Sequence, residues 1–77
     1  MVEGLPVHGY VDQSQDRIDM VNANKATEEQ ILRLLDMMRD GGDKFDQRWV
    51  SIARTHIEQA FMALNRAIFR PQRIDLP

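Results

Sequence analysis

Residues 43–70, DKFDQRWVSIARTHIEQAFMALNRAIFR, decide the fold, because they contain neither glycine nor proline and have the apolar spacing of one long helix. Asp43 can cap this helix at its start. Pro71 stops it, since the proline ring clashes with the preceding turn. The segment therefore predicts a single long C-terminal helix.

The mostly apolar residues of this segment form two adjacent stripes on a helical projection. One stripe comprises Phe45, Trp49, Ile52, His56, Ala60, Ala63 and Ala67, and the other Val50, Ala53, Ile57, Phe61, Leu64 and Ile68. Together they cover about half of the circumference, whereas packing against one hairpin partner needs an arc of about 100°. The surplus predicts contact with another subunit. The alternative is that two shorter helices, placed end to end, cover it within one chain.

The N-terminal part of the chain predicts an irregular arm followed by a short helix. Two glycines and a proline lie too close together in residues 1–9 for a helix to form. Asp12, followed three residues later by Gln15, forms a capping box that marks the start of a helix of about three turns. Residues at helical spacing continue this helix as far as Lys25.

A second capping box predicts a middle helix. Thr27 is followed three residues later by Gln30, and a Gly-Gly pair ends the apolar period that begins there, which gives a helix over 27–40. Residues 71–77 have the composition of a loose tail. We therefore expect one all-α domain over residues 1–77, with the short N-terminal, middle and long C-terminal helices packed antiparallel.

The composition is that of a small folded domain. The 77 residues are 43% hydrophobic and 29% charged, and the lack of cysteine excludes a disulfide framework, cysteine-ligated zinc and thiol catalysis. Neither a signal peptide nor a long apolar run is visible, so we expect a soluble, cytoplasmic protein with no membrane partner. A chain this small buries only about 60% of the surface that its unfolded form exposes, which favours oligomerisation.

The charge is polarised along the chain. Residues 1–46 contain five Lys or Arg against ten Asp or Glu, whereas residues 47–77 contain five Arg against two acidic residues. Nucleic-acid binding through Arg66, Arg70 and Arg73 is disfavoured, because the acidic first half would repel a polyanion. We expect no DNA partner, although a few cations could still bind a small anion.

Residues for catalysis are scarce. With no cysteine, two histidines far apart and no Glu-x-x-His pair, the chain offers neither a nucleophile with its base nor a di-iron site. We expect no enzyme, no cofactor and no bound metal. His56 is interpreted as a hydrogen-bonded core or interface residue and Trp49 as core.

Anion binding has better support. Lys25 and Thr27 flank the start of the helix predicted over 27–40, whose free backbone N–H groups would attract a phosphate. The alternative is that Thr27 only caps the helix and Lys25 is solvated. Arg66 and Arg70 lie one turn apart at a margin of the apolar arc, where they would border a subunit interface or simply complement the helix dipole.

These positions also carry a resemblance to a known family. The residues concerned are Gly9-Tyr10, Lys25-Ala26-Thr27 with the following Glu28-Glu29-Gln30, and Arg66. In their order, spacing and helical layout over residues 8–70, the chain resembles the small phage-encoded anti-CBASS proteins that act as sponges for cyclic-oligonucleotide second messengers. From the residues alone, the Tyr10 ring could stack on a base or equally pack on the domain.

The resemblance implies a helical homohexamer without catalytic activity, which sequesters cyclic dinucleotides and cyclic trinucleotides so that the host effector is not activated. It implies that dinucleotides bind between paired subunits, with Tyr10 stacking on a base and Lys25 at the phosphates. Trinucleotides are implied to bind where three subunits meet, through Arg66 assisted by Thr27. Asp12 could reach the dinucleotide pocket only at a base edge, because its carboxylate would repel phosphate.

A different class of function also fits the wide apolar arc of the last helix. A small helical protein-interaction module, such as a phage regulator or an antitoxin-like subunit, would use the arc to bind a protein partner. This alternative predicts no affinity for nucleotides.

Overall fold

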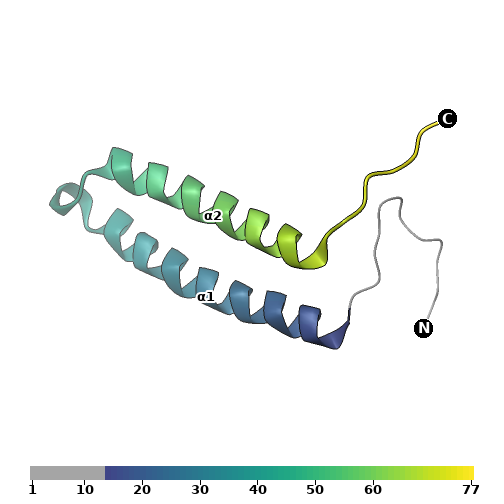
Figure 1. Ribbon diagram of the computed structural model, residues 1–77. Helices are drawn as coiled ribbons and strands as arrows, with labels where there is room; N and C mark the ends of the chain where they lie inside the picture. Colours follow the sequence, from purple (N-terminus) through teal and green to yellow (C-terminus); the bar gives the residue numbers. More distant parts are fainter. Residues whose placement is uncertain (1–13) are drawn as a thin grey trace.

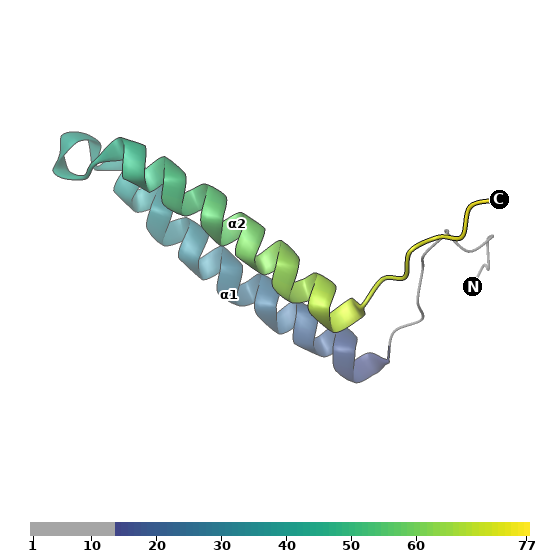
Figure 2. The ribbon, with the colours of Figure 1, turned by 45° about the horizontal axis from the view of Figure 1, so that its top comes forward.

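The computed structural model describes residues 14–77, which form a hairpin of two antiparallel α-helices. Helix α1 spans Gln15–Asp40, α2 spans Gln47–Phe69, and a short 3₁₀ helix, η1, spans Gly42–Lys44 in the turn. The two long helices lie side by side (Figure 1, Figure 2). No strand occurs within residues 14–77, which agrees with the predicted all-α fold.

The prediction of separate N-terminal and middle helices is wrong, because α1 is continuous from Gln15 to Asp40. The Thr27 hydroxyl donates a hydrogen bond of 3.2 Å to the Ala23 carbonyl oxygen one turn back, so Thr27 is an internal helical residue. Neither glycine nor proline interrupts α1, and alanines on both sides of Lys25 and Asn24 favour the helix. A capping-box pattern therefore occurs here inside a helix.

A heptad spacing runs through α1 and explains why the helix does not break at Thr27. Residues of α1 that are buried or half-buried recur every three or four positions at Arg17, Val21, Asn24, Glu28, Ile31, Leu35 and Met38. This spacing keeps one face of a helix against a partner. On α2, Val50 is buried and Ile57, Phe61 and Ile68 are half-buried. The second stripe predicted for the last helix therefore faces α1.

The observed N-cap of α1 is Ser14. The backbone N–H of Arg17 donates to Ser14 Oγ at 3.3 Å, which satisfies one of the N–H groups that a helix start leaves unpaired. Asp12, predicted as the cap, lies outside the described residues, and the helix begins after Ser14 instead.

The observed N-cap of α2 is Asp46, and the prediction of Asp43 is wrong. Asp46 Oδ1 accepts hydrogen bonds from the backbone N–H groups of Arg48 at 3.1 Å and Trp49 at 3.3 Å. Asp43 belongs to the 3₁₀ helix of the turn. At its other end α2 stops at Phe69, one residue before the predicted last residue, in agreement with the stop expected at proline.

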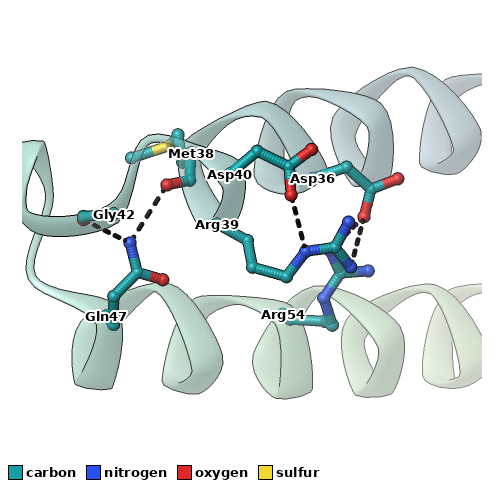
Figure 3. Close-up of polar contacts among 7 residues, drawn as sticks. All are labelled: Asp36, Met38, Arg39, Asp40, Gly42, Gln47 and Arg54. Atoms are coloured by element: carbon teal, nitrogen blue, oxygen red, sulfur yellow. Dashed lines mark hydrogen bonds and ion pairs between the residues drawn. The ribbon is translucent and has the colours of Figure 1, made fainter.

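The turn is closed by Gln47 and by the packing of Phe45 on Gly41. Gln47 Nε2 donates to the Met38 carbonyl at 3.1 Å and to the Gly42 carbonyl at 2.7 Å (Figure 3). A Cβ atom at Gly41 would lie 2.8 Å from the Phe45 ring, so no larger residue fits without a shift. Gly42 has a φ of 60°, which favours glycine. These contacts hold the start of α2 against the end of α1.

Few side chains hold the two helices together. The buried hydrophobic residues within 14–77 are Val21, Leu35 and Val50. Besides the bond of Gln47 to the Met38 carbonyl, two further polar contacts cross between the helices within residues 14–77. Arg54 pairs with Asp36 at 2.5 Å (Figure 3), and Asn24 Nδ2 donates to Asn65 Oδ1 at 3.1 Å. The hairpin therefore has a narrow seam and a small core.

The first predicted stripe is exposed in the single chain except at Ile52, which is half-buried. Trp49 is 60% exposed, so its interpretation as a core residue is wrong for one chain, and Ala60, Ala63 and Ala67 are also exposed. The helix predicted over 27–40 would be much shorter than the C-terminal helix, but the observed helices are similar in length, because α1 has 26 residues and α2 has 23. The surplus apolar surface is nonetheless present, since one equally long partner covers only one of the two stripes.

The observed cap of α2 gives a stability test. Asp46→Ala should lower the free energy of unfolding by about 1 kcal/mol, because it removes the acceptor for two N–H groups at the helix start. Asp43→Ala is the matched control and should change it by less than about 0.5 kcal/mol. Urea unfolding followed by circular dichroism measures both, and a larger loss for Asp43→Ala would contradict the observed cap.

Candidate functional site

Lys25 and Arg66, two of the four predicted ligand residues, lie at the same level of the hairpin. Lys25 follows Asn24 on α1, Arg66 follows Asn65 on α2, and the two asparagines are hydrogen-bonded to each other. Successive residues of a right-handed helix are about 100° apart. Because the two helices are antiparallel and their asparagines face each other, the step to the next residue points Lys25 and Arg66 toward the same side of the hairpin. Lys25 and Arg66 therefore lie on one side of the hairpin, on neighbouring helices.

Both cations are exposed and form no ion pair within residues 14–77. Glu29, one turn after Lys25, pairs with Arg33 at 3.0 Å instead. Arg66 has Met62 and Arg70 one turn away on either side, so no acidic residue of its own helix face neutralises it. Each cation can thus bind a phosphate without first losing a protein partner.

Arg66 lines a shallow depression on the outer surface of α2. Its volume is about 510 Å³, and its lining residues are Gln59, Met62, Ala63, Asn65 and Arg66. The lining combines apolar side chains with amide and guanidinium donors, which suits a ligand that has both rings and anionic groups. All five residues come from α2, so residues 14–77 give this depression a wall from one helix only.

Thr27 does not lie at a helix N-terminus, and the anion site predicted there is wrong. In the interior of α1 each backbone N–H donates to the carbonyl four residues back, so no free N–H groups surround Thr27. Thr27 is exposed, about 200° around the helix from Lys25 at two steps of about 100°. Lys25 and Thr27 of one chain therefore face different directions.

The other predicted site residues are placed as follows. Tyr10 lies outside the described residues, so its pairing with Lys25 stays a prediction. His56 is exposed and, within residues 14–77, has no hydrogen-bond partner, so it is not a core histidine of the single chain. It lines a second depression on α2, of about 270 Å³, together with Ser51, Ile52 and Thr55.

Within residues 14–77, no group of three or more His, Cys, Asp or Glu residues lies close enough to hold a metal ion. In the same part of the chain, neither helix has the length and apolar character needed to cross a membrane.

The sequence reasoning missed the asparagine pair next to the two cations. Asn24 and Asn65 are 41 residues apart, so only the register of the hairpin brings them together. A signal existed for Asn24, because it lies three residues after Val21 on the face that packs against α2. A polar residue at such a position needs a hydrogen-bonding partner across the seam.

Fold and surface together define a small helical hairpin that exposes apolar side chains and, among its described residues, cations without an ion pair. The sequence matches the family model described as Acb2/Tad1, hairpin domain, over residues 3–69. Because this match covers most of the chain, the chain belongs to the Acb2/Tad1 hairpin-domain family, the family of phage anti-CBASS cyclic-oligonucleotide sponge proteins. The resemblance seen in the sequence is confirmed. No curated protein matches the chain.

The continuity of α1 at Thr27 is testable by the sign of a stability change. Thr27→Ala should raise the free energy of unfolding by a few tenths of a kcal/mol, up to about 0.5, because alanine favours a helix interior more than threonine does. If Thr27 were a cap, the same change would cost about 1 kcal/mol.

Thr55→Ala is the matched control, because the Thr55 hydroxyl makes the equivalent internal bond to the Ser51 carbonyl at 3.2 Å. The two variants should shift urea unfolding in the same direction. A loss of about 1 kcal/mol for Thr27→Ala alone would contradict the continuous helix.

Proposed function

We propose that the chain binds cyclic dinucleotides and cyclic trinucleotides without cleaving them, and that it thereby blocks CBASS antiphage signalling in the host cytoplasm. The observation that carries the proposal is the family membership, together with the two unpaired cations at one level of the hairpin. A sponge needs affinity and no catalytic step. Recovery of intact ligand from the heated complex is therefore part of the proposal.

The proposed active form is a homo-oligomer, a hexamer. The exposed stripe on α2 supports association, because Trp49 in this stripe is 60% exposed in the single chain. Met62, which lies outside the stripe on the same helix, is 71% exposed. Burying apolar surface stabilises by about 25 cal/mol for each Å² removed from water. The depression beside Arg66 supports it as well, since in the part of the chain that the structure describes its wall comes from α2 alone.

Two pockets are proposed. In the first, between paired subunits, Tyr10 stacks on a base of a cyclic dinucleotide and Lys25 binds its phosphates. In the second, where three subunits meet, Arg66 binds the phosphates of a cyclic trinucleotide. Thr27 from another subunit assists it, in keeping with the opposite orientation of Thr27 and Lys25 in one chain. In a symmetric oligomer each subunit contributes one cation to a shared pocket. Two subunits then supply two positive charges for the two phosphates of a dinucleotide, and three subunits supply three for a trinucleotide.

The net acidic character of the chain is compatible with anionic ligands. Part of the acidic charge of α1 is paired with arginine, because Asp36 pairs with Arg54 and Arg39, and Asp40 pairs with Arg39 (Figure 3). Net charge chiefly affects the rate of encounter, whereas donors already positioned at the site determine affinity.

A second candidate function, a protein-interaction module, is favoured by the same exposed stripe of α2. It requires no cation to remain unpaired, and it predicts no binding of cyclic nucleotides by the wild-type chain. Calorimetry with a cyclic dinucleotide and a cyclic trinucleotide separates the two functions.

Selective loss of each ligand tests the two-pocket proposal. Lys25→Ala and Tyr10→Ala should lower the affinity for a cyclic dinucleotide at least about tenfold and change the affinity for a cyclic trinucleotide by less than about twofold. Arg66→Ala should have the opposite selectivity. For Lys25 and Arg66 the size follows from the loss of a hydrogen bond between charged groups, and for Tyr10 it follows from the loss of base stacking, worth about 1–3 kcal/mol. Isothermal titration calorimetry on the full chain measures both ligands.

Lys44→Ala and Arg73→Ala are the matched controls, because both residues are exposed and neither forms an ion pair within residues 14–77. They should leave both affinities unchanged. Equal loss of both ligands in Lys25→Ala and Arg66→Ala would contradict the two pockets. Hydrolysed ligand in the heated complex would contradict sequestration.

A further inference from the structure

Asn65 stands between the seam of the hairpin and the depression beside Arg66. It is half-buried, it lines that depression, and it accepts a hydrogen bond of 3.1 Å from Asn24 Nδ2. Within residues 14–77, Asn65 is thus the one lining residue whose side chain is hydrogen-bonded to α1. No other lining residue is held in place in this way.

The hydrogen bond decides which end of the Asn65 amide stays available. Oδ1 is the atom that accepts from Asn24, so Nδ2 with its two N–H groups has no partner within residues 14–77. An unused donor that is half-buried beside a depression is most stable when a ligand acceptor or water satisfies it. The depression therefore offers an amide donor next to the Arg66 guanidinium.

We propose that Asn65 is a further ligand-recognising residue of the Arg66 pocket, donating from Nδ2 to a phosphate oxygen or a base acceptor of a cyclic trinucleotide. Asn24 is its positioning residue, because it holds the amide from α1. This inference rests on the proposed function, in which Arg66 binds the trinucleotide. It adds a neutral donor whose direction is fixed before the ligand arrives.

Gln59 is the other amide of the lining and fits this role less well. It is exposed, and it makes no hydrogen bond within residues 14–77 that would fix its side chain. Ordering a free glutamine costs side-chain entropy on binding, whereas Asn65 is already held. The geometry therefore favours Asn65 over Gln59 as the specific donor.

The first experiment compares two neutral substitutions that break the same hydrogen bond. Asn65→Leu removes both the bond to Asn24 and the donor, whereas Asn24→Leu removes the bond and leaves the donor. Titration calorimetry of the full chain with a cyclic trinucleotide should give at least about tenfold weaker binding for Asn65→Leu than for Asn24→Leu. Equal losses would show that only the seam matters and would overturn the inference.

A second pair of variants keeps the seam intact. In Asn65→Asp, Asn24 can still donate to a carboxylate oxygen, but the Nδ2 donor of Asn65 is lost. Asn22→Asp is the control, because it adds the same charge at an exposed position of α1 outside the depression. Asn22 lies two residues before Asn24, which is about 3 Å away along the helix axis. We expect the affinity of Asn65→Asp for the cyclic trinucleotide to be at least about tenfold lower than that of Asn22→Asp. The midpoint of thermal unfolding of Asn65→Asp should be unchanged.

The cyclic dinucleotide serves as the internal control, and its affinity should differ by less than about twofold between Asn65→Asp and Asn22→Asp. If the wild-type chain binds no cyclic trinucleotide, the proposed function fails. If the wild type binds it and Asn65→Asp binds as tightly as Asn22→Asp, the proposed function stands and the inference about Asn65 is overturned.

Discussion

One geometric constraint underlies this structure: a helix that packs against a single partner can hide only one side of its surface. The apolar residues of α2 form two stripes, and α1 covers the one that contains Val50. The other stripe, with Trp49 at its start, stays in water in the single chain. Lengthening α1 does not help, because the two helices already match in length. The proposed association of copies follows from this surplus.

The same constraint shapes the proposed binding sites. Within residues 14–77 the seam is narrow and its buried hydrophobic residues are Val21, Leu35 and Val50, so the proposed recognition uses the outer surfaces of the hairpin. There, Lys25 and Arg66 form no ion pair with any residue from 14 to 77, while Glu29 and Asp36 are bonded to arginines nearer the turn. The cations are thus available at the level where Asn24 and Asn65 fix the register of the two helices. Association of copies would then supply the missing walls.

Much of the fold was predictable, and the errors have physical causes. The long C-terminal helix was recognisable because proline and the glycine pair bound an uninterrupted apolar period. The break before Thr27 was wrong because a threonine can satisfy its hydroxyl on the preceding turn as well as at a cap. Val21 and Leu35 lie two heptads apart on one face, which is a stronger signal of continuity than the local capping pattern is of a boundary. Similarly, Asp43 and Asp46 are equally good caps by type, and only the 3₁₀ turn decides between them.

The site was predictable in part. The positive charge of Lys25 and Arg66 is given by their residue types, and their exposure follows from their positions on the helices. The contact between Asn24 and Asn65 was not predictable, because it depends on the register between residues far apart in the chain. Tyr10 lies outside the described residues, so its role depends on the family and on the mutants.

The mass of the full chain in solution tests the central claim most directly. Light scattering after size-exclusion chromatography, over a wide range of micromolar concentrations, should give six times the mass of one 9.0-kDa chain, since the uncovered stripe of α2 drives association. A folded species with the mass of a single chain at the highest concentration would contradict the account.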